Sequence, residues 1–170
     1  MRPEHESEYC DYAANRLVPM RRFAYLVCGD WHRAEDAVQN AFVKLYLAWA
    51  RAQRADSLDA YTRRIVLNCV KEVQRRHWFT RERSTSEPPD RAATGDTGSE
   101  ERRLVLDALA QLPMRRRATL VLRYWEDLSV EQTARVLRCS PATVKSQTVR
   151  GLRTLRGLLT DSFREQIERT

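Results

Sequence analysis

Cysteine and histidine are too few and too scattered in this sequence to indicate a metal centre or a nucleophilic active site. The four cysteines, Cys10, Cys28, Cys69 and Cys139, form no closely spaced pair, and the chain has three histidines. Cys28 and Cys69 fall on apolar helical stripes, where a small reduced thiol usually belongs to the core. We therefore predict no zinc site, no catalytic thiol and no cofactor.

Long apolar runs are also missing, as are segments that alternate with the period of a β-strand. No stretch is apolar enough to cross a bilayer and residues 1–22 hold no signal-peptide core, so we expect a cytoplasmic protein without membrane insertion. Acidic residues are outnumbered, since 30 Lys and Arg face 23 Asp and Glu for a formal charge of +7. This balance favours polyanionic partners, and the helical periodicity predicts an all-α fold.

Large apolar residues are absent from residues 81–100, which contain two prolines and two glycines. Such a stretch cannot bury a core, so we predict a flexible linker between two small helical domains. From residue 82 to 100 it carries five acids against two arginines, which is consistent with a solvated tether. The predicted divisions are a domain at 7–80, the acidic linker at 81–100, a domain at 101–160 and a tail at 161–170.

Residues 129–156 have the pattern of a helix, a tight turn and a second helix that carries cations but no acids. Ser129 is suited to cap the first helix, and Ser140 followed by Pro141 is suited to begin the second. This is the layout of a DNA-reading helix-turn-helix. One side of the second helix should pack inward: Val144, Thr148, Gly151, Leu152, Leu155 and Leu159.

The other side of this second helix carries side chains that suit the major groove of DNA. Arginine can bond a guanine edge with two hydrogen bonds, while serine, threonine and lysine mostly contact phosphates. The alternative is an ordinary amphipathic helix with a solvated basic face. The predicted DNA contacts are Thr143, Lys145, Ser146, Gln147, Arg150 and Arg153.

In the N-terminal half, a first helix is expected from about Glu8 to Cys28, with Gly29 as its stop and Asp30 as the cap of the next. That next helix has an apolar stripe at Ala34, Val38, Ala41, Phe42, Leu45, Ala48 and Trp49. Its other face combines acids and amides with apolar groups, as partner-binding faces do, although isolated exposed apolar residues are common. This face carries Asp36, Gln39, Asn40, Val43 and Tyr46, with Glu35 beside them.

Ser57 is suited to cap a third helix, whose predicted buried stripe is Leu58, Tyr61, Ile65, Cys69 and Val73. A second line along this helix consists of Arg64, Asn68, Lys71 and Arg75, with Trp78 close to it. Cations interleaved with aromatic rings suit separated DNA strands. The competing interpretation is a basic helix end with Trp78 and Phe79 in the core.

The order of these features resembles the extracytoplasmic-function class of bacterial RNA polymerase sigma factors, closest to those of actinobacteria. The resemblance rests on DWHRAEDAVQNAFVKLY at 30–46, YTRRIVLNCVKEVQRR at 61–76, LDALAQLPMRRRATLVLRYWEDLS at 106–129 and the helix-turn-helix. It covers about residues 9–159 and implies the two conserved domains called regions 2 and 4. It also implies a non-catalytic factor that brings core polymerase to promoters and assists their melting.

The resemblance implies a role for each surface. Asp36, Gln39, Asn40, Val43 and Tyr46 match the helix that grips the β′ clamp of core polymerase, and the β flap is a further contact. Asn68, Lys71 and Arg75 match the stretch that engages the melted −10 element, and residues 55–59 match a base-capturing loop. Thr143, Lys145, Ser146 and Arg150 match readers of the double-stranded −35 element. The linker would thread toward the active-site cleft, and an anti-sigma factor is a further expected partner.

The sequence departs from the family in the turn, where Arg138 and Ala142 replace common glycines. Either the turn keeps φ below zero at Arg138 or this residue accepts strain. Two other functions fit the helix-turn-helix. A conventional regulator would bind an operator as a dimer without polymerase. A DNA-targeted nuclease would need an acid-base or metal constellation, which the sequence does not suggest.

Overall fold

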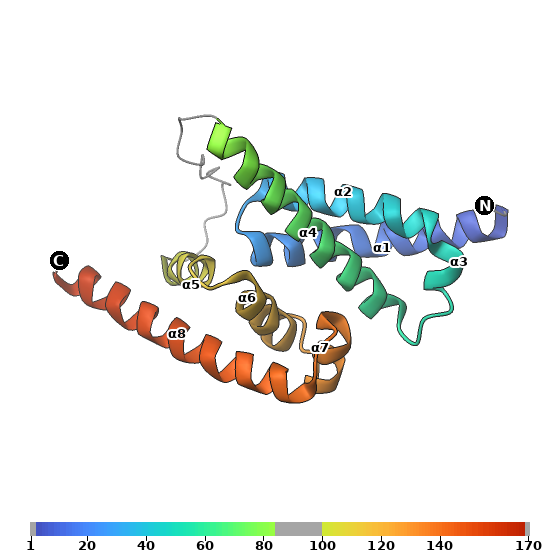
Figure 1. Cartoon of the computed structure of the whole chain (residues 1–170). Coiled ribbons are helices and arrows are strands. Elements are labelled where there is room, and N and C mark those ends of the chain that lie inside the picture. Colours follow the sequence, from blue (N-terminus) through green and yellow to red (C-terminus); the bar gives the residue numbers. More distant parts are fainter. Residues whose placement is uncertain (1–2, 84–99, 169–170) are drawn as a thin grey trace. The chain divides into compact units, whose positions relative to one another are not determined.

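The computed structural model describes residues 3–83 and 100–168, and every regular element in these two ranges is helical (Figure 1). The chain divides into two compact units. The predicted all-α class is confirmed. Most of the predicted linker lies outside the described residues, although helix α4 runs three residues into it, to Arg83, and α5 begins at its last residue, Glu100. No helix in the two described ranges is long and apolar enough to span a membrane.

The first unit consists of α1 (Pro3–Cys28), α2 (Trp31–Leu47), the single turn α3 (Trp49–Ala52) and α4 (Leu58–Arg83). Helix α2 packs against both α1 and α4. Gly29 ends α1 with a φ of 77°, a conformation that costs glycine little. Asp30 then caps α2 by accepting a hydrogen bond of 2.9 Å from the backbone N–H of Arg33. This turn is the one that the sequence predicts.

The predicted apolar stripe of α2 is buried, except that Ala48 is only half-buried. The stripe predicted for α4 is partly wrong. Among the described side chains of α4, Thr62, Val66, Leu67, Cys69 and Val70 are buried. Four residues of the predicted stripe are only half-buried: Leu58, Tyr61, Ile65 and Val73. The buried face of α4 is shifted because this helix contacts both α1 and α2. Because Thr62 is polar, a search for apolar periodicity does not assign it to the buried face. Thr62 is accommodated because its hydroxyl donates a 2.9 Å hydrogen bond to the carbonyl of Leu58.

The second unit consists of α5 (Glu100–Ala110), α6 (Met114–Leu120), the π-helical turn η1 (Val121–Trp125), α7 (Val130–Leu137) and α8 (Pro141–Glu168). Helix α8 packs against α5, α6 and α7. Leu122 and Val144 are fully buried in this unit. Gly151 allows a close approach of α8 to α6, because a Cβ atom there would lie 3.1 Å from Cδ1 of Leu120. The predicted tail is helical as far as Glu168.

Both hydrogen bonds of a capping box fix the start of α7. Ser129 Oγ accepts from the backbone N–H of Gln132 at 3.0 Å, and Gln132 Oε1 accepts from the backbone N–H of Ser129 at 2.8 Å. We expect Ser129→Ala to lower the free energy of unfolding by about 0.5 to 2 kcal/mol. Urea unfolding monitored by circular dichroism would measure this loss. The control Ser146→Ala, at an exposed position within α8, should change stability little; equal losses in both variants would contradict this role of the cap.

Candidate nucleic-acid and partner interfaces

Helix α8 begins in a way that fixes the direction of its outer face. Ser140 Oγ accepts a 3.1 Å hydrogen bond from the backbone N–H of Thr143, and Pro141 occupies the first helical position. One turn further along, Val144 is completely buried against the rest of the unit. The second helix of the predicted helix-turn-helix is therefore anchored at its N-terminal end, where such helices contact base edges.

The six predicted DNA contacts on α8 do not have equal access to solvent. Lys145, Ser146, Arg150 and Arg153 are exposed, whereas Thr143 and Gln147 are half-buried. The hydroxyl of Thr143 lies 2.9 Å from Ser140 Oγ, and Oε1 of Gln147 is shielded from solvent with no hydrogen-bond partner among the residues that the structure describes. The structure thus presents four polar side chains on one outer face and places the other two at its edge.

Arg138, between α7 and α8, has a φ of 51° and a ψ of 53°, which is the left-handed conformation. The structure therefore selects the strained alternative for this position. The backbone N–H of Cys139 donates to the carbonyl of Ala134 at 3.1 Å and closes the end of α7. This geometry is the usual place for glycine, and Arg138 adopts it at a cost. The other departure, Ala142, lies within α8.

We expect Arg138→Gly to raise the free energy of unfolding by up to about 1 kcal/mol, because glycine adopts positive φ without a Cβ clash but loses more chain entropy. Thermal or urea unfolding would measure the change. Arg138→Ala is the matched control, since it removes the guanidinium group but keeps the Cβ atom. An equal gain from alanine would show that charge, rather than backbone strain, is responsible.

The outer face of α2 combines exposed polar and apolar groups. Asp36, Gln39 and Asn40 are exposed, and Val43 exposes 60% of its surface. Leu47, at the end of the same helix, is 80% exposed. Such a mixed patch is typical of partner-binding surfaces.

Tyr46, the fifth residue predicted on the α2 face, has a different environment. It is half-buried, and its ring lies edge-on to Tyr9 of α1 with 5.1 Å between ring centroids. Part of this side chain therefore packs within the unit. The structure brings four of the five predicted residues onto the exposed face of α2 and leaves Tyr46 at its margin.

The outer face of α4 is cationic and aromatic. Asn68, Lys71 and Arg75 are exposed, and Trp78 and Phe79 expose 66% and 59% of their surfaces. The interpretation in which Trp78 and Phe79 enter the core is therefore wrong. Arg64, at the start of the predicted line, is half-buried. Exposed rings beside cations are the combination that binds unstacked bases and phosphates.

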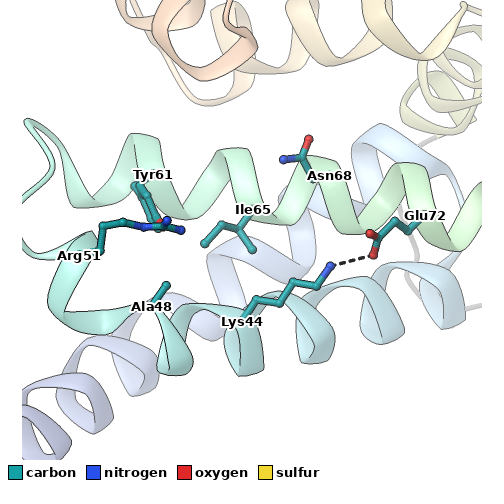
Figure 2. A pocket seen from close by; sticks show the side chains of 7 residues that line it. All are labelled: Lys44, Ala48, Arg51, Tyr61, Ile65, Asn68 and Glu72. Carbon is teal, nitrogen blue, oxygen red and sulfur yellow. Dashed lines mark hydrogen bonds and ion pairs between the residues drawn. The ribbon is translucent and has the colours of Figure 1, made fainter. Parts of the chain in front are cut away.

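An open groove with a volume of about 570 Å³ lies between α2, α3 and α4, and periodicity did not predict it (Figure 2). At one end, Lys44 Nζ donates to Glu72 Oε2 at 2.8 Å. This hydrogen bond raises the pKa of Lys44 and lowers the pKa of Glu72, so both groups stay charged near neutral pH. Between the two ends lie Ala48, Ile65 and Asn68.

At the other end of the groove, the guanidinium group of Arg51 donates to the hydroxyl of Tyr61 at 3.1 and 2.9 Å. Its central carbon also lies 5.9 Å from the centroid of the Tyr61 ring. The groove thus offers a cation, an aromatic ring and the exposed amide of Asn68 (Figure 2). It can receive a flat polar group, with hydrogen bonds at its edge and van der Waals contact at its face.

Comparison with known proteins gives two family matches in the same order as the two units. Residues 15–80 match sigma-70 region 2, and residues 102–155 match sigma-70, region 4. An RNA polymerase sigma-E factor of Streptomyces avermitilis is 34% identical over 150 residues, covering 88% of this chain and 83% of the relative. A factor with the same name from Streptomyces coelicolor is 31% identical over 154 residues, covering 88% and 84%.

Other similarities extend to the named class and to solved structures. An ECF RNA polymerase sigma factor SigE of Mycolicibacterium smegmatis is 32% identical over 145 residues, covering 81% of this chain and 56% of the relative. The sigma factor RpoE of Bartonella quintana, solved with the anti-sigma factor NepR, has a TM-score of 0.72 at 22% identity. That match covers 90% of this chain and 97% of the solved one, and it shows a shared fold.

Proposed function

This chain belongs to the extracytoplasmic-function class of RNA polymerase sigma factors, and on that premise we propose that its two units read two separate promoter elements. As a sigma factor it binds core RNA polymerase and directs it to promoters. It is a transcription initiation factor, and in our proposal it catalyses no reaction itself and acts in the cytoplasm with the polymerase.

The second unit reads the −35 element as duplex DNA through the outer face of α8. The observation that carries this assignment is the row of exposed Lys145, Ser146, Arg150 and Arg153 that follows a fixed turn. The N–H of Cys139 closes the end of α7 on the carbonyl of Ala134, and Ser140 caps the start of α8. Arg150 is the candidate for a bidentate contact with guanine, and Lys145 is the candidate for a phosphate contact. Thr143 and Gln147 support the contact from the edge of this face.

The first unit holds polymerase with one helix and the melted −10 element with another. The exposed Asp36, Gln39, Asn40 and Val43 of α2, with Tyr46 at their margin, contact the β′ clamp. On α4, Asn68, Lys71, Arg75 and Trp78, with Arg64 behind them, contact the separated strands. We further assign the groove between these helices to one unstacked base of the −10 element, because Arg51, Tyr61 and Asn68 line it with a cation, an aromatic ring and an amide.

The two units that read DNA must adjust to the fixed spacing of the two promoter elements. A linker with few apolar residues allows this adjustment. We therefore keep the divisions 7–80, 81–100 and 101–160 as proposed functional boundaries, with the β flap as a further contact of the second domain. Two solved structures of similar proteins contain a protein partner, and in one of them this partner is an anti-sigma factor. An anti-sigma factor of this chain would cover the Asp36 face, the Arg150 face or both.

Transcription in vitro tests the function as a whole. Purified core polymerase and this chain would be incubated with a library of genomic promoter fragments, and the transcripts would be sequenced. We expect initiation at a subset of fragments that share two spaced sequence elements. A conventional regulator would instead bind an operator without polymerase and add no new start sites, so this outcome would reject the proposal.

A further inference from the structure

The groove of the first unit is braced from behind by α1. The hydroxyl of Tyr12 lies 2.9 Å from Asp59 Oδ1 and 2.9 Å from Thr62 Oγ1, so it can donate its proton to either. Arg16 forms an ion pair with the same carboxylate of Asp59. Asp59 and Thr62 lie on both sides of Tyr61 in the first turns of α4, and Tyr61 forms one end of the groove.

The ring of Tyr12 is held independently of its hydroxyl. It packs against Trp49 with 5.6 Å between ring centroids, and Trp49 is 2% exposed. Tyr9 packs on the same indole at 5.3 Å, but its hydroxyl donates to the carbonyl of Phe42 on α2 at 2.8 Å. Two tyrosines therefore share one aromatic cluster, and only the hydroxyl of Tyr12 reaches α4.

The hydroxyl of Tyr12 is a permanent donor near neutral pH. Burial raises the pKa of Tyr12 to about 12, and the carboxylate of Asp59 adds to this rise while Thr62 and Arg16 oppose it. The proton therefore stays on the oxygen and is available to Asp59 or Thr62. A second link runs beside it, since Gln53, which follows α3, is hydrogen-bonded to Glu8 of α1.

We propose that Tyr12, acting through Asp59 and Thr62, is a positioning residue that holds the Arg51–Tyr61 end of the groove in the shape that receives a −10 base. This inference rests on the proposed function of the groove. Tyr12 lies before the stretch 15–80 that matches region 2, so the brace adds a segment of α1 to the promoter-reading unit. Without the hydroxyl, the first turns of α4 lose one of their fixed contacts with α1.

The test compares Tyr12→Phe with its matched control Tyr9→Phe, both in the full chain with purified core polymerase. Each variant removes one tyrosine hydroxyl and keeps the ring on Trp49. Two quantities are measured: hydrogen exchange of backbone amides in residues 53–62 of the chain alone, and promoter opening reported by 2-aminopurine in the −10 element. Core affinity and melting temperature are recorded for both variants.

We expect Tyr12→Phe to speed exchange in residues 53–62 and to reduce promoter opening by about 2- to 12-fold, the usual worth of one hydrogen bond. Tyr9→Phe should leave both quantities near the wild type, while core affinity stays the same in both variants. Exchange that does not rise in Tyr12→Phe would overturn the brace. Faster exchange without any loss of promoter opening would overturn its link to the groove.

A wrong sigma-factor function and a wrong role for Tyr12 would give different experimental results. If the wild-type chain opened no promoter, the proposed function would be wrong, and the exchange measurement would still decide whether Tyr12 braces α4. If the wild type opened promoters and both tyrosine variants behaved alike, the sigma-factor assignment would stand and the positioning role of Tyr12 would be rejected.

Discussion

Arg150→Ala should reduce discrimination at one base pair of the −35 element by about 1 to 3 kcal/mol, or roughly 5- to 150-fold. Arg150 is exposed on α8, behind a turn capped by Ser140 and anchored by the buried Val144. A guanidinium group in this place can bond both acceptors of a guanine edge, and alanine retains neither bond. The loss should be confined to templates that carry the preferred base pair.

The measurement is initiation by the reconstituted polymerase on templates with each substitution along the −35 element. Lys145→Ala is the control on the same exposed face. Because Lys145 is the candidate phosphate contact, Lys145→Ala should weaken binding to all promoter sequences alike. It should also reduce the slope of log affinity against log salt concentration by about one. Core affinity should be unaffected by either variant. An equal fall in core affinity and promoter selectivity for Arg150→Ala would refute its role as a base reader.

The second large effect is expected from Asp36→Arg, which should weaken capture of core polymerase by at least about tenfold. Asp36 is exposed on the mixed face of α2, so reversing its charge should leave the fold of the unit intact. In a complementary interface, the new arginine would meet a surface arranged for an acid. The variant would lose the favourable interaction of Asp36 with the polymerase and add a repulsion between like charges, and both changes lower the affinity.

Co-purification or fluorescence anisotropy with core polymerase would measure this affinity. Asp11→Arg makes the same charge change at an exposed position of α1 and serves as the matched control. We expect normal core binding from Asp11→Arg and unchanged melting temperature from both variants. Undiminished association of the Asp36→Arg chain with core polymerase would show that the α2 face is not the polymerase contact.

Local signals in the sequence predicted much of the secondary structure and many of the side chains that lie on exposed helix faces. Gly29 and Asp30 mark the turn between α1 and α2, and Ser129 marks the start of α7, because capping and positive φ depend on single residues. The outer face of α8 followed from its 3.6-residue period. These features need no knowledge of which other helix packs nearby.

Features that depend on several helices were not predictable in the same way. The buried face of α4 is shifted because α1 and α2 both cover it, and its first buried residue, Thr62, is polar. The groove draws its lining from three helices whose spacing carries no periodic signal. The hydroxyl of Tyr12 reaches Asp59, which is 47 residues away in sequence. Tyr46 has a suitable residue type, but its ring contact with Tyr9 of α1 turns it partly inward. Gln147 is half-buried at the edge of the α8 face.

The most direct test of the whole account is multi-round transcription by core polymerase from one selected promoter, with the −35 and −10 elements altered separately and together. The account predicts that RNA synthesis requires this chain, falls when either element is altered, and shows base preferences that change with Arg150→Ala at the upstream element only. RNA synthesis that does not depend on adding the chain, or that is indifferent to both elements, would contradict it.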